Sequence, residues 1–255
     1  MKAFDVHCHL YDESFDKDRD NVIAKAKKVL SGVIVAGENP ETNRKILKLE
    51  KKYPKFWHSA YGVHPTSVHN LTDEEIEDEI KWIKSQKPIA ISEIGLDFAV
   101  IKREKLDEFA KMRQVEWFER FIDLAKELDV PVIVHSRWAT KHVIEILEDL
   151  KPKKVILHAF SGTVEEAKRA LKLGYKFSIG NTVAYAEQKI ELVKALPVDA
   201  MMLETDSPVL PPKPGERNEP SNITFVISEI AKIKKISEDN IIKITNKNVK
   251  ELFGL

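Results

Sequence analysis

The sequence predicts an α/β fold in which eight parallel strands close into a single (βα)8 TIM barrel. Short apolar runs rich in β-branched residues alternate with longer stretches of helical period. Two of the runs, Val132-Ile133-Val134 and Val155-Ile156-Leu157, are continuously apolar, as strands buried on both faces of a parallel sheet should be. A length of 255 residues is typical of one such barrel, so we expect one hydrolase domain spanning residues 1–255.

Eight runs qualify as strands, and each ends in glycine, serine, asparagine or a polar cluster. The expected strands are Ala3–His7, Val33–Ala36, Trp57–Gly62, Ile89–Ile94, Val132–His135, Val155–His158, Lys176–Ile179 and Met201–Glu204. Helical patterns fill the segments between and after them. Helix starts agree with this order, because Asn39 before Pro40 offers an N-cap, and Thr72 and Thr163 are each followed by glutamate three residues later.

Two segments depart from the simple alternation. Phe98–Leu106 is basic and leads into a long helix with an apolar face. Ser207–Pro220 contains five of the twelve prolines, which predicts a stiff irregular loop.

Composition limits the possible partners and the compartment. The chain has 41 basic and 41 acidic residues, so no overall positive field attracts nucleic acid, and any polyanion site must be local. Cys8 is the only cysteine, and the N-terminal residues lack an apolar signal region, which favours a cytoplasmic protein. The longest apolar runs have the length of strands, so we expect no membrane partner. The oligomeric state is left open, with a monomer as the working expectation.

Histidines and acids gather at the carboxyl ends of the predicted strands. His7 and His9 lie two apart on the first strand, so their side chains share one face, while Val6 and Cys8 should face away. The remaining polar strand ends are His64, Glu93, His135, His158 and Asp206. Because the carboxyl ends of barrel strands meet at one face, we expect these side chains to converge there.

This set exceeds the ligands that one metal ion needs. A satisfied buried histidine would explain any single member, but five of the eight histidines lie at or just beyond strand ends. A catalytic zinc takes three protein ligands and a water, whereas two divalent metals would use the whole set. A carboxylate can offer one oxygen to each of two ions, so Glu93 is the expected bridge.

The chain resembles the TatD family of metal-dependent deoxyribonucleases, within the amidohydrolase-like barrels, over nearly its full length. Seven sequence blocks in order carry the resemblance. They are Asp5-Val6-His7-Cys8-His9-Leu10, Gly62-Val63-His64-Pro65, Glu93-Ile94-Gly95-Leu96-Asp97, Pro131-Val132-Ile133-Val134-His135-Ser136-Arg137, His158-Ala159-Phe160-Ser161-Gly162, Glu204-Thr205-Asp206-Ser207-Pro208 and Arg217-Asn218-Glu219-Pro220.

The resemblance implies a divalent-metal phosphodiesterase that acts on DNA. One metal would be held by His7, His9, Glu93 and Asp206, and the second by Glu93, His135 and His158. The family pattern also places His64 near the scissile phosphate. The identity of the two ions stays open between magnesium, zinc and manganese, because four imidazoles favour zinc or manganese while the resemblance implies activity with magnesium.

The residue types suggest roles in hydrolysis by a metal-activated water. Asp206 is the candidate for orienting that water and accepting its proton. His64, Arg137 and Arg217 are candidate phosphate contacts, with the Lys102–Lys105 stretch as a further part of a basic rim. Asp5 should lie deeper than His7 on the same face and orient it. A narrow barrel mouth admits strand ends better than duplex, which predicts an exonuclease on single-stranded DNA.

Two departures from the family pattern concern substrate contacts. Phe98-Ala99-Val100 replaces an aromatic pair and arginine, and Trp138 stands where the family commonly has aspartate. The Trp138 indole could stack on a base or pack against the following helix, and we favour packing. The main alternative function is ester or amide hydrolysis on the same barrel, for instance by an aminoacyl-tRNA deacylase. A binding protein without activity ranks last, because the ligand set is complete.

Overall fold

The structure is a computed structural model that describes residues 1–255. Eight strands form one sheet in the order in which they occur in the chain, and every neighbouring pair is parallel. The strands are β1 (Ala3–Cys8), β2 (Leu30–Ala36), β3 (Trp57–Tyr61), β4 (Ala90–Asp97), β5 (Val132–Arg137), β6 (Val155–Leu157), β7 (Lys176–Ile179) and β8 (Met201–Leu203). The predicted (βα)8 barrel is confirmed.

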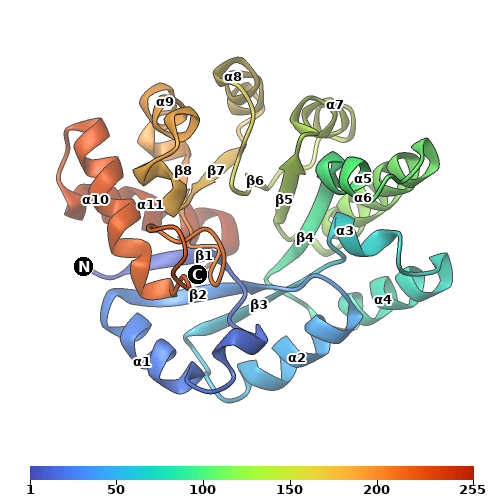
Figure 1. The fold of residues 1–255 in the computed structure, drawn as a ribbon, viewed down its shortest axis with the longest axis horizontal. Coiled ribbons are helices and arrows are strands. Elements are labelled where there is room, and N and C mark those ends of the chain that lie inside the picture. The colour runs from blue at the N-terminus through green and yellow to red at the C-terminus, as the bar shows by residue number, and fades with distance from the viewer.

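Helices surround the strands and follow one another around the ring in chain order (Figure 1). They are α1 (Arg19–Val29), α2 (Pro40–Glu50), α3 (Pro65–Val68), α4 (Asp73–Gln86), α5 (Phe98–Arg103), α6 (Glu108–Leu128), α7 (Thr140–Leu150), α8 (Val164–Lys172), α9 (Glu187–Ala195), α10 (Ile223–Lys234) and α11 (Glu238–Phe253). Four short 3-10 turns are η1 (Glu13–Phe15), η2 (Asn181–Ala184), η3 (Val198–Ala200) and η4 (Pro220–Asn222). None of the helices combines the length and the apolar character that crossing a membrane would require.

The predicted helix starts are confirmed in detail. Asn39, Thr72 and Thr163 each accept a hydrogen bond from the backbone N–H three residues later, and each cap is reciprocated by the side chain at that position. Such caps satisfy backbone donors that the first turn leaves free, and each contributes about 1 kcal/mol. The basic segment after β4 contains the short helix α5, and the predicted long helix is α6.

Four strands extend beyond the ranges that the sequence predicts: β1 reaches Cys8, β5 reaches Arg137, and β2 and β4 are extended by three residues each. β2 begins at Leu30 because Leu30 pairs with Ala3, and the Ser31 hydroxyl donates to the Ala3 carbonyl. β4 continues to Asp97, which pairs with Arg137 at the end of β5. Glu93 lies inside β4 where the register with β5 shifts, between Ile91 and Ile94, and its amide donates to the Gly37 carbonyl at 2.7 Å.

The barrel closes where the first strand meets the segment that follows the last strand. The Asp206 amide donates to the His7 carbonyl at 3.0 Å, and the His9 amide donates to the Ser207 carbonyl at 2.7 Å. The buried Asp5 carboxylate adds bonds from the Thr205 amide at 3.0 Å and the Thr205 hydroxyl at 2.6 Å. The segment around β1 and the segment after β8, which lie far apart in the sequence, therefore lie side by side at one edge of the site.

Alternate strand residues face two separate cores. Val132 and Val134 belong to a large apolar cluster that includes the helices, whereas Ile133 belongs to a small cluster with Phe4 and Val6. Because strand side chains alternate between faces, the small cluster lies on the barrel axis. The expectation that Val6 and Cys8 share the face away from the histidines holds only for Cys8. β1 shifts register between Asp5 and Cys8, which breaks the alternation.

Glycines allow the neighbouring backbones to approach β4 on both sides. A Cβ at Gly62 would lie 2.7 Å from the Ser92 carbonyl carbon, immediately before Glu93. A Cβ at Gly95 would lie 2.1 Å from the His135 carbonyl oxygen, and Gly95 has a φ of +136°. Only glycine fits at these positions, because backbone atoms cannot move aside as side chains can.

We expect Gly95→Ala to lower the free energy of unfolding by about 3 kcal/mol or more, because it combines an unfavourable φ with a backbone clash. Gly174→Ala is the matched control, since Gly174 has a φ of +82° and a Cβ there would meet nothing within 4 Å. Its cost should be only about 1 kcal/mol. Denaturant titration of both variants measures the difference. Equal losses of unfolding free energy in the two variants would show that the close approach of Gly95 to β5 does not exclude a larger residue.

Candidate active site

The structure brings together every predicted metal-ligand candidate at the carboxyl ends of the strands. We define the acid–histidine cluster as His7, His9, His64, Glu93, His135, His158 and Asp206. His7 and His9, on and just after β1, place their Nε2 atoms 3.2 Å apart, as the two-residue spacing predicts. Glu93 lies within β4 and His135 within β5, and His64, His158 and Asp206 follow β3, β6 and β8.

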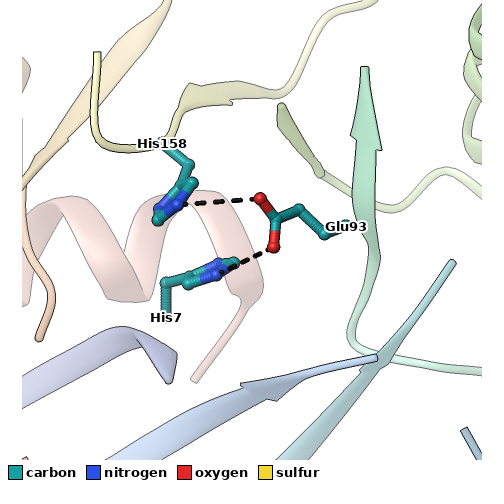
Figure 2. Close-up of side chains that lie close together, drawn as sticks. All are labelled: His7, Glu93 and His158. Atoms are coloured by element: carbon teal, nitrogen blue, oxygen red, sulfur yellow. Dashed lines mark ion pairs between the residues drawn. The ribbon is translucent and has the colours of Figure 1, made fainter. Parts of the chain in front are cut away.

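Glu93 stands at the centre of this cluster and divides it in two. Its Oε2 lies 3.3 Å from His7 Nε2 and 3.7 Å from His9 Nε2. Its Oε1 lies 2.8 Å from His135 Nδ1 and 3.7 Å from His158 Nε2. Figure 2 shows His7 and His158 one above the other, each facing a different oxygen of the carboxylate. One carboxylate thus offers one oxygen to each of two groups of histidines.

Asp206 provides the second carboxylate and lies beside the first group. Its Oδ1 lies 3.2 Å from His9 Nε2 and 3.6 Å from His7 Nε2, and its Oδ2 lies 3.8 Å from His158 Nε2. The residue adopts a left-handed backbone with a φ of +57°, three residues after the end of β8. This turn directs the carboxylate into the barrel mouth from the strand that closes the sheet.

Hydrogen bonds at the far side of two rings determine which nitrogen faces the cluster. His9 Nδ1 lies 3.1 Å from the Ala36 carbonyl, and His158 Nδ1 lies 2.7 Å from Glu204 Oε2. Both partners only accept, so the proton of each neutral ring belongs on Nδ1 and the lone pair on Nε2. Metal-binding histidines are commonly oriented in this way by a carbonyl or carboxylate behind them.

His64 has the opposite arrangement. The Thr66 amide donates to His64 Nδ1 at 3.2 Å, and the Thr66 hydroxyl lies 2.6 Å from the same atom. The proton of the neutral ring therefore belongs on Nε2, which lies 3.5 Å from Glu93 Oε1. His64 is placed to donate a hydrogen bond within the site.

Three further carboxylates support the cluster, and the sequence assigned a role to only one of them. Glu204 holds His158 and also accepts from the Ala159 amide at 3.1 Å. Asp97 lies 3.2 Å from His135 Nε2 and caps α5 through the Val100 amide at 2.8 Å. Asp97 belongs to the same sequence block as Glu93, and Glu204 to the same block as Asp206, from which it is two residues away. This short spacing is the sequence feature that could have identified the two carboxylates.

The third carboxylate is Asp5, which the sequence placed deeper than His7. It is fully buried and accepts from the His7 amide at 3.1 Å in addition to its bonds with Thr205. Burial raises the pKa of Asp5 to about 8, although these hydrogen bonds oppose the shift. Asp5 therefore orients the backbone that carries His7 instead of contacting the ring.

Burial and mutual charge set the protonation of the cluster. Burial favours a neutral Glu93, but His64, His7 and His158 hold its pKa well below the usual range. Burial likewise disfavours a protonated His9, yet the hydrogen bond with Asp206 and the charge of Glu38 raise its pKa to about 10. The carboxylates of Glu93 and Asp206 thus stay ionised. They require positive charge beside them, which protons or metal ions supply.

The donor set fits divalent metal ions. Three trios of donor atoms lie within 4.8 Å of one another: His7 with Glu93 and His158, His7 with His9 and Asp206, and His64 with Glu93 and His135. Imidazole nitrogens and carboxylate oxygens are the ligands that zinc and manganese take in catalytic sites. The sequence grouped His158 with Glu93 and His135, and both histidines lie beside the same Glu93 oxygen, with His64 as a third neighbour of that oxygen.

All members of the acid–histidine cluster except His7 line a cavity of about 480 Å³ that opens at the carboxyl face of the barrel. Arg137 lines it from the end of β5 and is exposed, without an ion pair to hold its guanidinium. Lys189, which sequence reasoning missed, also lines it and donates to the Ala159 carbonyl at 2.7 Å. Burial lowers the pKa of Lys189 to about 8.

The structure does not bring Arg217 to this cavity. Its guanidinium donates to Asp18 at 2.9 and 2.7 Å and to Glu219 at 2.9 Å, and it lies over the Phe15 ring. A guanidinium with its donors bound to two carboxylates has little capacity left for a phosphate. Arg217 braces the proline-rich loop against the N-terminal segment instead.

Comparisons with known proteins agree with this arrangement. The family described as "TatD related DNase" matches residues 4–254. The chain is 37% identical to "Uncharacterized metal-dependent hydrolase YabD" of Bacillus subtilis, over 99% of each chain. It is 30% identical to "3'-5' ssDNA/RNA exonuclease TatD" of Erwinia amylovora, over 99% of this chain and all of that one (100%).

The fold has a close counterpart among solved structures. The TatD homolog YJJV from Escherichia coli superposes with a TM-score of 0.90 at 27% identity, covering 99% of this chain and 98% of that chain. The sequence-based prediction of a TatD-type hydrolase is confirmed by the family match and these relatives. They do not favour the alternative of an ester or amide hydrolase.

We expect Glu204→Gln to weaken divalent-metal binding about 10- to 100-fold, because the amide cannot accept from both His158 and the Ala159 amide as the carboxylate does. Isothermal titration of Mn²⁺ or Zn²⁺ into metal-free protein measures this loss. Glu79→Gln is the control, since Glu79 is an equally buried carboxylate that binds Asn43 and Arg44 away from the cavity. Equal metal affinity in the two variants would contradict an orienting role for Glu204.

Proposed function

The chain belongs to the TatD-related DNase family, and from that premise we propose that it is a metal-dependent phosphodiesterase that shortens single-stranded DNA from its ends. The observation that carries the proposal is the position of Glu93. Its two oxygens face separate groups of histidines at the base of a cavity whose rim presents a free arginine. This is the arrangement that a two-metal phosphodiesterase needs.

We assign the metal ligands from the donor atoms. His7, His9, Glu93 and Asp206 would hold one ion, and Glu93, His135 and His158 the other. When bound, two divalent ions would neutralise phosphate oxygens and lower the pKa of a bound water. Four imidazoles make zinc or manganese a better fit than magnesium, which prefers oxygen ligands.

The remaining steps fall to the side chains of the chain itself. Asp206 would accept the proton of the attacking water, because its ionised carboxylate faces the cavity. His64 would donate from Nε2 to a phosphate oxygen, since Thr66 holds its Nδ1 as an acceptor. Arg137 would fork onto the phosphate at the cavity rim.

The shape of the site supports single-strand ends as the substrate. Glu93 and Asp206 are only 3% and 7% exposed, so the reacting phosphate must enter the cavity to reach them. A duplex is too wide and stiff to bring its backbone to that depth, whereas a flexible terminal nucleotide can enter. A relative that carries the name of a single-strand exonuclease adds support to this substrate class.

Glu93→Gln should lower kcat/KM by more than about a hundredfold, beyond the range seen for residues that only orient a ligand. The substitution keeps the shape of the side chain and removes the charge shared by both groups of histidines. Digestion of single-stranded DNA with saturating Mn²⁺ measures the loss, and thermal unfolding of the metal-free protein should show a folded chain. Near wild-type hydrolysis would disprove a bridging role.

The end preference predicts that linear single-stranded DNA is degraded while the circular form of the same strand resists. The control is the same circle after it has been cut once, which should then be degraded as fast as the linear strand. Gel analysis of both forms, with RNA and duplex DNA in parallel, gives the rates. Equal cleavage of circular and linear strands would mean that the site accepts internal phosphates.

A further inference from the structure

Trp138 is a large apolar side chain left in solvent at the rim of the cavity. It follows Arg137 at the end of β5 and is 65% exposed, so the expectation that it packs against α7 is wrong. The backbone turns left-handed at this residue, with a φ of +57°. In contrast, Trp57 and Trp117 are 1% and 5% exposed.

A basic groove lies against one side of this indole. Its volume is about 420 Å³, and Phe98, Lys102, Lys105 and Lys111 line it together with Trp138. The Lys102 Nζ lies 5.4 Å from the centre of the indole ring. Lys102 and Lys105 make no ion pair. The groove lies between α5, the start of α6 and Trp138, and Figure 1 shows α5 beside α6.

Positive charge prevails in the groove. Asp107 and Glu108 also line it, where Asp107 caps α6 through the Ala110 amide and Glu108 pairs with Lys111 at 2.8 Å. Three lysines against two carboxylates leave a net charge of about +1, and Lys102 and Lys105 are the lysines without an ion pair. That charge suits a phosphate backbone.

Trp138 connects the basic groove to the catalytic cavity. Arg137 lines the cavity, and Trp138, the next residue in the chain, lines the groove. On its other side Trp138 borders a second groove, of about 490 Å³, which shares Ser161 with the cavity. A nucleic acid strand whose end occupies the cavity and which leaves past Arg137 therefore meets the indole.

We propose that Trp138 is a stacking platform for an unpaired base of the strand, one or two nucleotides outside the cavity, with Lys102 and Lys105 contacting the adjoining phosphates. This inference rests on the proposed function and adds a substrate subsite to it. Aromatic side chains stack on every base, because each base presents a π-face, whereas paired bases in a duplex are not available. The subsite therefore favours single strands without selecting a sequence.

The test uses full-length protein with Glu93 intact and Mn²⁺ present. The probe is a short oligothymidylate with phosphorothioate linkages, which keep the charge of the strand and slow its digestion, and binding is followed by anisotropy of a label on the strand and by quenching of tryptophan fluorescence. Trp138→Ala should weaken binding about tenfold, the size expected for one lost stack. Trp138→Phe should keep most of the affinity and lose the quenching, since Trp138 is the exposed indole.

Two controls separate stacking from other effects. Phe225→Ala removes an aromatic side chain that is 47% exposed on α10 and lines neither groove, and it should leave binding unchanged. An oligonucleotide with an abasic site at the stacked position should bind equally to proteins with and without Trp138. Lys105→Gln should also reduce the slope of affinity against salt by about 0.7, the value for one single-strand phosphate contact.

The outcomes distinguish this inference from the proposed function. If the protein with Trp138 intact binds no oligonucleotide, the proposed function and the subsite are both rejected. If it binds and Trp138→Ala binds equally well, only the subsite is rejected. An equal loss of affinity for duplex DNA would also reject the subsite, because a paired base cannot stack on the indole.

Discussion

The buried charge of Glu93 is the constraint on which the site depends. An ionised carboxylate taken out of water is unstable unless opposite charge and hydrogen bonds surround it. His7, His135, His158 and His64 provide that surrounding from four other strands, within 2.8–3.7 Å of its oxygens. Convergence of strand ends in a barrel makes this possible, because no single helix or hairpin could bring four rings to one carboxylate.

The position of the Glu93 carboxylate in turn depends on neighbouring backbone segments that pack closely against β4. The Glu93 amide donates to the Gly37 carbonyl at 2.7 Å, which anchors β4 to the end of β2. Gly62 approaches from β3 and Gly95 from within β4 itself, each so closely that a methyl group would overlap backbone atoms. Gly62 and Gly95 therefore let backbone pack closely on either side of Glu93, which fixes the path of β4 at the centre of the site.

The fold and the cluster could be predicted from sequence because both follow from periodic rules. Parallel strands collect their carboxyl ends at one face, so polar residues at strand ends must meet, whatever the packing details. The partners of Glu204 and Asp97 could not be predicted, because they depend on ring rotations that no spacing encodes. Arg217 was misplaced for a related reason: Asp18, its partner, is 199 residues away in the sequence. The exposure of Trp138 could not be predicted either, because Trp138 itself has a left-handed backbone conformation, which a tryptophan rarely adopts.

The closure of the barrel has a consequence for folding during synthesis on the ribosome. The bonds that join Asp5 to Thr205 link residues 200 positions apart, and Asp206 follows immediately. A nascent chain that ends before this point has an open sheet edge beside β1 and an incomplete set of carboxylates. Contacts of such long range form late, since the intervening loop must be closed first. The strand that completes the barrel, β8, and the last carboxylate of the cluster, Asp206, are therefore synthesised within a few residues of each other. A partly synthesised chain cannot carry a complete site.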